Sequence, residues 1–248
     1  PTKDSSNRSA NPAVIRASTI LFDTMQELYK HENKIKKHQK ISHYSYGRYG
    51  SSTTIELENI LKELEQAYHV FLTGTGFGGV ALALMSLCRP GDELLVSDNV
   101  YGPTKEISEK LLKEFKIHAK FYDPDSFEDL KNKISKKTKM ILVENPGSNT
   151  FEFQDLNKIV SLARKKNIYT FLDNTWGTPL YLKPLKLGFD MSFSSATKYF
   201  SGHSDAMGGS LAVNKKVFKK IMFFYKLSGY RMSADEAYLI IRGLRTLD

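Results

Sequence analysis

The sequence predicts an α/β fold in which helices flank a mostly parallel β-sheet. Segments with a strand pattern alternate along the chain with segments that carry apolar residues at helical spacing, and short turns separate them. The segment 139–143 is almost entirely apolar, which is typical of a strand buried on both faces. A chain of 248 residues is long enough to bury a core of this kind.

Residues 1–45 show no clear period, and we expect them to form an N-terminal arm that contacts a neighbouring subunit, with one short helix near 24–38. The main domain is expected to cover 46–248. Its first helix follows a turn-rich stretch, and Thr53 with Glu56 matches a capping box. Apolar residues at helical spacing support that helix: Leu57, Ile60, Leu61, Leu64 and Tyr68.

The alternation continues to the end of the chain, with turn sequences at its boundaries. RPGD at 89–92 and DPDS at 123–126 are turns, and the final residues 242–248 fit a helix. Because the turns are short and the alternation is regular, the strands are predicted to be parallel. Strands are expected at 69–73, 93–97, 116–122, 139–143, 168–173, 190–194 and 209–213, and helices at 80–87, 104–115, 127–134 and 156–166.

Composition and charge exclude several classes of protein. The net charge is +9, but the lysines are scattered over expected helix surfaces, so we expect no nucleic-acid partner. No apolar run could cross a bilayer and the polar start lacks a signal-peptide core, which predicts a cytoplasmic protein without a membrane partner. Cys88 has apolar neighbours and is expected to be a buried, unreactive thiol. His203 and Asp205 lack a third ligand at suitable spacing, so no metal is expected.

A glycine-rich loop follows the strand at 69–73 and opens a helix. Gly74, Gly76 and Gly79 match G-x-G-x-x-G, and Asp98 ends the next strand, as in a dinucleotide fingerprint. A nicotinamide-dependent oxidoreductase is therefore one hypothesis. A tight turn without a ligand is another. The third is a site for any phosphate, because amides at a helix N-terminus bind anions.

Three further side chains follow expected strands and favour a particular phosphorylated ligand. Lys198 lies among small and hydroxyl residues, Asp173 ends a strand, and Tyr101 follows another. Because ligands gather at the carboxyl ends of parallel strands, these groups could hold a phosphorylated aromatic aldehyde. Lys198 would bind the aldehyde covalently, Asp173 would pair with a ring nitrogen, and Tyr101 would cover a ring face. A nicotinamide enzyme would give Lys198 and Asp173 no joint role.

Six stretches carry a resemblance to a known family: YSYGRYG, TGTGFGG, VYGPTKE, ENPGSNTFEFQD, FLDNTW and SSATKYFSGHSDAMGG. With them the chain resembles the pyridoxal-phosphate-dependent enzymes of cysteine and methionine metabolism, and within these the cystathionine β-lyases. The resemblance implies the large domain of a fold-type I enzyme. It also implies pyridoxal 5′-phosphate as the cofactor.

The resemblance also implies roles for individual residues. Lys198, Tyr101 and Tyr46 match catalytic positions. Tyr46 and Arg48 match a pair that reaches the cofactor of the neighbouring subunit, which implies at least a dimer and, as is usual in the family, a homotetramer built as a dimer of dimers. The cofactor-binding set implied by the family comprises Lys198, Asp173, Tyr101, Gly76, Phe77, Ser195, Thr197, Tyr46 and Arg48.

Two local features favour β-elimination over the γ-acting relatives. The sequence 46–50 lacks the Asn-Pro-Thr that follows the tyrosine–arginine pair in the γ-enzymes, and Pro103 occupies the place of a cysteine in methionine γ-lyases. The expected reaction converts L-cystathionine to homocysteine, pyruvate and ammonia, a step of methionine biosynthesis. A γ-synthase, a cystathionine γ-lyase or a methionine γ-lyase remains the alternative.

Relatives continue beyond the position of Asp248 into a smaller C-terminal domain that binds the substrate carboxylate, and nothing in this sequence matches its arginine. Binding of the cofactor is therefore a firmer expectation for these residues than complete catalysis.

Overall fold

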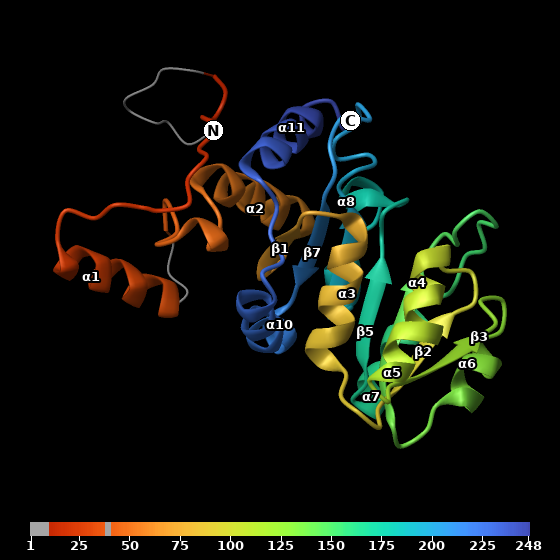
Figure 1. Cartoon of the computed structure of the whole chain (residues 1–248). Coiled ribbons are helices and arrows are strands. Elements are labelled where there is room, and N and C mark those ends of the chain that lie inside the picture. The colour runs from red at the N-terminus through yellow and green to blue at the C-terminus, as the bar shows by residue number, and fades with distance from the viewer. Residues whose placement is uncertain (1–9, 38–40) are drawn as a thin grey trace.

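The computed structural model describes residues 10–37 and 41–248 (Figure 1). Its centre is a sheet of seven strands in the order β1-β7-β6-β5-β4-β2-β3. The strands span β1 His69–Thr73, β2 Glu93–Ser97, β3 His118–Tyr122, β4 Thr138–Glu144, β5 Tyr169–Asp173, β6 Met191–Ser195 and β7 Gly209–Val213.

The sheet is mostly parallel, as predicted, but β7 is antiparallel to both of its neighbours. The parallel direction expected for the strand at 209–213 is therefore wrong. Ser195 is paired with Gly209, so the loop between them returns the chain directly beside β6. A parallel strand would need a crossover connection of a dozen or more residues, usually through a helix.

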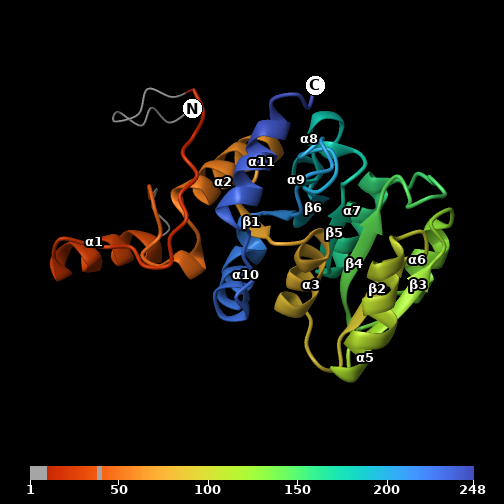
Figure 2. The same ribbon diagram turned by 45° about the horizontal axis from the view of Figure 1, so that its top comes forward.

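Helices cover both faces of the sheet and make a three-layer structure (Figures 1 and 2). Alternate residues of β4 face opposite layers: Leu142 packs in the core beneath α3 (Gly76–Leu87), and Val143 packs in the core beneath α7 (Leu156–Lys166). The remaining helical segments are α2 Ser52–Glu65, α4 Gly102–Glu106, the π turn η2 Ile107–Leu111, α5 Leu112–Glu114, α6 Phe127–Lys133, α8 Thr178–Tyr181, α9 Pro184–Leu187, α10 Lys215–Ser228 and α11 Ala234–Leu244.

Most predicted elements are present, and the differences lie at their ends. The helix predicted at 80–87 begins at Gly76, because the glycines themselves form its first turn. The strand predicted from 116 begins at His118, since Lys116 has a φ of 59°. Residues 242–248 contain only the end of α11. Ser51, not Thr53, caps α2, and its capping-box partner is Thr54.

The N-terminal arm lies beside α2 and then leaves the body of the chain. The Thr53 hydroxyl accepts from Ile15 N at 2.9 Å and donates to Ala13 O at 2.8 Å, so it fastens the arm to the start of α2. The predicted arm helix is α1 (Met25–Lys36), which has no buried residue and projects away from the sheet (Figures 1 and 2).

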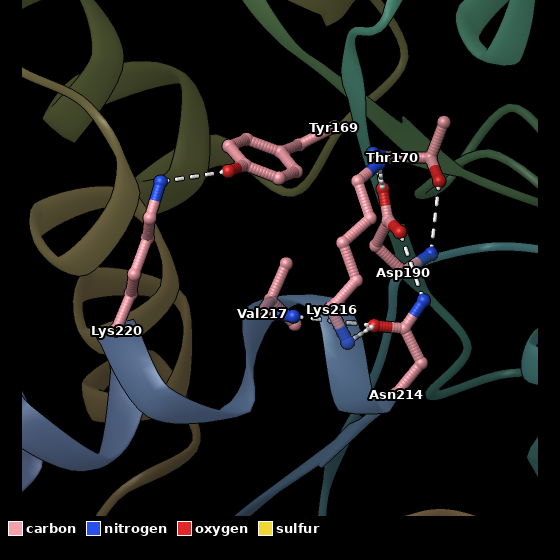
Figure 3. A network of polar contacts seen from close by, with 7 residues as sticks. All are labelled: Tyr169, Thr170, Asp190, Asn214, Lys216, Val217 and Lys220. Carbon is pink, nitrogen blue, oxygen red and sulfur yellow. Dashed lines mark hydrogen bonds and ion pairs between the residues drawn. The ribbon is translucent and has the colours of Figure 1, made fainter.

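The sheet edge at the amino-terminal ends of β5 and β6 is held by Asp190. Its carboxylate accepts from Thr170 N at 3.1 Å and from the Asn214 side chain at 2.8 Å, and it pairs with Lys216 (Figure 3). Asn214 also caps α10. This network fixes the sheet at the edge opposite to the predicted site residues.

Candidate cofactor and active site

The predicted site residues follow strands that end at one edge of the sheet. β7 is antiparallel to both β1 and β6, so β1 runs in the same direction as β6, β5, β4 and β2. The glycine loop follows β1, Lys198 follows β6 and Tyr101 follows β2, while Asp173 is the last residue of β5. The topology therefore brings the four features to the same edge.

The glycine loop forms the N-terminus of α3. Thr75 caps this helix by accepting from Gly78 N at 3.0 Å. Gly76 lies against Ser195, and a Cβ atom on residue 76 would come within 2.6 Å of the Ser195 hydroxyl oxygen. The amides of Gly76 and Phe77 and the hydroxyl of Ser195 are thus close together. Helix amides combined with a hydroxyl suit a phosphate group.

The turn after β6 carries Lys198. Its amide donates to Ser195 O at 3.0 Å, and its carbonyl accepts from Gly202 N at 2.8 Å. Thr197 is fixed by Gly208, whose amide donates to the Thr197 hydroxyl at 3.0 Å. The Lys198 side chain is exposed, and within the described residues its amine makes no ion pair. A rigid backbone with a free amine suits covalent attachment of an aldehyde.

Asp173 is a buried carboxylate, 8% exposed, at the end of β5. It accepts from Thr175 N at 3.0 Å, and burial raises its pKa to about 6. The Thr175 hydroxyl in turn accepts from Ser195 N at 2.8 Å. The predicted ring acid and the predicted phosphate cradle are therefore joined through Thr175.

A second carboxylate, the partly buried Glu144, lies beside Asp173 and was not predicted as a site residue. The two are paired at the last rung between β4 and β5, and Glu144 accepts from Tyr101 N at 2.6 Å. Burial, followed by the charge of Asp173, raises the pKa of Glu144 to about 8. A charged residue directly after the apolar strand 139–143 was the signal available in the sequence.

Tyr46 and Arg48 make their contacts elsewhere on the chain. Tyr46 forms an isolated β-bridge with Thr19, and Arg48 donates to Lys226 O at 2.9 Å and stacks on Tyr49 at 4.7 Å. Both belong to the turn around η1 (Gly47–Tyr49). Their predicted role toward a neighbouring subunit stays a prediction.

The topology argues against the dinucleotide interpretation of the glycine loop. That fingerprint requires the first two strands to be neighbours in a βαβ unit. Here β7, β6, β5 and β4 separate β1 from β2, and Asp98 at the end of β2 is paired with Lys105.

The remaining polar candidates have structural partners. His203 Nδ1 lies 2.6 Å from Ser201 O, and Asp205 is paired with Arg242. Trp176 packs between Phe151 and Tyr199, with ring centroids 5.4 and 5.7 Å apart.

The arrangement of an amine, a buried acid, an exposed aromatic ring and a helix N-terminus fits pyridoxal phosphate, and comparison with known proteins decides the matter. The family model described as "Cys/Met metabolism PLP-dependent enzyme" matches residues 1–248. The chain belongs to this family. Its cofactor is pyridoxal phosphate.

The relatives differ in the reactions for which they are named. The cystathionine beta-lyase of Bordetella avium is 34% identical over 98% of this chain and 61% of its own length. The L-alanine/L-glutamate racemase of Wolbachia pipientis is also 34% identical, over 96% of this chain and 60% of its own. A crystal structure of cystathionine gamma synthase from Xanthomonas oryzae pv. oryzae has a TM-score of 0.89 and 29% identity, covering 99% of this chain and 60% of that one. The chain spans 58% to 69% of the length of the first curated relatives it matches.

Within the described residues, no helix is long and apolar enough to cross a membrane.

Proposed function

We propose that this chain provides the cofactor-binding part of a carbon–sulfur lyase that cleaves L-cystathionine by β-elimination to homocysteine, pyruvate and ammonia. The observation that carries this proposal is the joined set of Lys198, Ser195 and Asp173 at one sheet edge. The β-specific part rests on the sequence 46–50, on Pro103, and on relatives named cystathionine beta-lyase.

The bound cofactor supplies an aldehyde for covalent attachment and an aromatic ring that takes up electrons from the substrate Cα. Lys198 would hold this aldehyde. Its amine would also take the proton from the substrate Cα and deliver a proton to the leaving sulfur atom. The turn held by Ser195 and Gly202 keeps the amine in position for both transfers.

Asp173 keeps the ring nitrogen protonated, because a carboxylate beside it favours the charged form of the ring. Tyr101 covers one face of the ring. Ser195, Thr197 and the amides of Gly76 and Phe77 hold the phosphate at the N-terminus of α3. Together these groups would hold the cofactor beside Lys198.

Tyr46 and Arg48 complete the site of a neighbouring subunit in this proposal. Arg48 is exposed on an ordered turn, and the arm with α1 projects beyond the body of the chain. Both features suit contact with a second copy, so the proposed assembly is a dimer of dimers with an arm at 1–45 and a cofactor-binding domain at 46–248. The predicted cytoplasmic location stays a prediction.

Borohydride reduction tests the cofactor site. A peptide containing Lys198 should carry the reduced cofactor, and Lys198→Ala should abolish the attachment. If the label appeared on another lysine, the assignment of Lys198 would be wrong.

The products made from cystathionine by the full-length protein test the reaction. Pyruvate supports β-elimination, whereas 2-oxobutanoate would show a γ-acting lyase. If cysteine and an activated homoserine are supplied instead, transfer of the cysteine without release of a keto acid would show a γ-synthase.

Amino-acid racemisation is a second candidate, because the Wolbachia relative named for it is as similar to this chain as the Bordetella lyase. A single amine that removes and returns the Cα proton can serve both reactions. Chiral chromatography after incubation with L-alanine or L-glutamate distinguishes them. Appearance of the D-isomer without release of a keto acid from cystathionine would replace the lyase proposal.

A further inference from the structure

Glu144 and Asp173 point to the same face of the sheet. They are directly opposite each other on the parallel strands β4 and β5, and residues paired in this way project to the same side. Leu142 and Phe171, two positions earlier on each strand, both pack in the core beneath α3. The two carboxyl groups therefore stand together on the α3 side, at the edge where the cofactor would lie.

Glu144 is also bound to the start of α4. Its Oε2 atom accepts from Tyr101 N at 2.6 Å. Tyr101 occupies the N-cap position of α4, where its own side chain makes no capping hydrogen bond. The Tyr101 side chain is 52% exposed, so the backbone anchor to Glu144 restrains a residue that has little packing around its ring.

We infer that Glu144 is a positioning residue that fixes Tyr101 relative to Asp173, so that the ring-covering tyrosine and the ring acid meet the cofactor in one geometry. This inference rests on the proposed function of Asp173 and Tyr101. It adds a group that accepts a hydrogen bond from Tyr101, lies beside Asp173 on the next strand, and has no need to touch the cofactor.

The electrostatics indicate which property of the Glu144 side chain matters, its charge or its hydrogen-bond acceptor. The carboxyl groups of the buried Asp173 and the partly buried Glu144 stand at adjacent positions and resist a double negative charge. Burial, and then the charge of Asp173, raise the pKa of Glu144, which favours the protonated form of its carboxyl group beside Asp173. A protonated carboxyl group still accepts the Tyr101 N–H through its carbonyl oxygen. The length of the side chain and its acceptor therefore matter, and its charge does not.

Three variants separate these properties. Glu144→Gln keeps the length and the acceptor without the charge. Glu144→Asp keeps the carboxyl group but shortens the reach, and Glu144→Leu removes the acceptor. Glu106→Gln is the matched control, because Glu106 is an exposed carboxylate on α4, the helix whose N-cap position Tyr101 occupies, and is paired with Lys110.

The readouts are the affinity of the apoprotein for pyridoxal phosphate and the visible circular dichroism of the bound cofactor, which reports the surroundings of its ring. We expect Glu144→Gln and Glu106→Gln to match the wild type. Glu144→Asp and Glu144→Leu should weaken binding about tenfold and change the dichroism per bound cofactor. The inference is overturned if Glu144→Asp matches the wild type while Glu144→Gln fails, or if Glu144→Leu has no effect.

A double-variant cycle guards against general misfolding. If Glu144 acts through Tyr101, adding Glu144→Leu to Tyr101→Ala should weaken binding no further than Tyr101→Ala alone. Additive losses would contradict the inference. A wild-type protein that takes no cofactor onto Lys198 would refute the proposed function itself. If the wild type does take the cofactor onto Lys198 but the two substitutions weaken binding additively, only the role of Glu144 is refuted.

Discussion

Gly76 and Ser195 are in direct contact, although 119 positions separate them: a Cβ atom at residue 76 would lie 2.6 Å from Ser195 Oγ and 3.1 Å from its Cβ. The contact joins the N-terminus of α3 to the end of β6. Because these two elements provide the proposed phosphate cradle, its dimensions depend on the absence of a side chain at residue 76.

Gly76→Ala should therefore weaken cofactor binding. The added methyl group must push Ser195 away from the α3 amides, and we expect the Kd for pyridoxal phosphate to rise about tenfold. Quenching of Trp176, the single tryptophan, follows the binding. Gly102→Ala is the control, because nothing lies within 4 Å of a Cβ at that position. Unchanged affinity in Gly76→Ala would show that the phosphate does not bind between these elements.

Thr175→Val should loosen the link between Asp173 and the phosphate cradle. The substitution keeps the shape of the side chain and removes the hydroxyl that accepts from Ser195 N at 2.8 Å. We expect a loss of about 1 kcal/mol in the free energy of unfolding, measured by urea denaturation. Thr175→Ser keeps the hydroxyl and should restore most of the loss. A loss in Thr175→Ser but not in Thr175→Val would assign the effect to the methyl group instead, because only the serine variant lacks it.

The sequence specifies its elements well because their signals are local. The apolar strands at 69–73 and 209–213 have the predicted bounds, and so does the helix at 156–166. The direction of β7 is not a local property, because it depends on the connection that precedes the strand. The segment after β6 contains Lys198 and a loop without a crossover helix, so β7 can only return antiparallel.

The site was predictable where its residues follow strands, and hidden where it depends on strand order. Asp173 ends a strand that the sequence marks clearly, and Lys198 and Tyr101 each follow one. Glu144 acquires its importance only because β4 lies beside β5 and because Tyr101 arrives from the end of β2. The local pattern shows a charged residue after the apolar strand 139–143, but it does not show which residues become its neighbours.

Glu65 should make the stability of the chain depend on pH. It ends α2, is 1% exposed, and has a pKa raised to about 8 by burial, which Ser192 and Lys183 only partly offset. The folded state thus holds a proton that the unfolded state releases near pH 4.5, so stability falls as pH rises from about 4.5 to about 8. A negative charge at a helix C-terminus is unfavourable as well.

Glu65→Gln should remove this dependence of stability on pH. Near pH 8 it should raise the free energy of unfolding by about 3 kcal/mol relative to the wild type. Thermal or urea unfolding across the pH range measures it. Glu63→Gln, at an exposed position of the same helix, should keep the slope of the wild type. A wild-type protein whose stability is flat between these pH values would contradict a protonated Glu65.

Arg231 should matter more for stability as pH rises, because it faces a second buried acid. Its guanidinium donates to the Tyr225 hydroxyl at 2.8 Å and lies 5.1 Å from the centre of the Tyr44 ring. The Tyr44 hydroxyl donates to Glu58 at 3.0 Å. Burial raises the pKa of Glu58 to about 7, and the charge of Arg231 limits that rise.

Arg231→Met removes the cation and should raise the pKa of Glu58 further. Below about pH 6 the Glu58 carboxyl is protonated in both proteins, so the variant loses only the contacts of the guanidinium. Near pH 8 Glu58 ionises beside the Arg231 cation in the wild type, whereas the variant has no cation there. The stability that the variant loses relative to the wild type should therefore be larger at pH 8 than at pH 6, by at least about 1 kcal/mol. Urea unfolding at the two pH values measures the difference. Adding Glu58→Gln should make the loss independent of pH, whereas a pH-dependent loss in that double variant would assign the effect to another group.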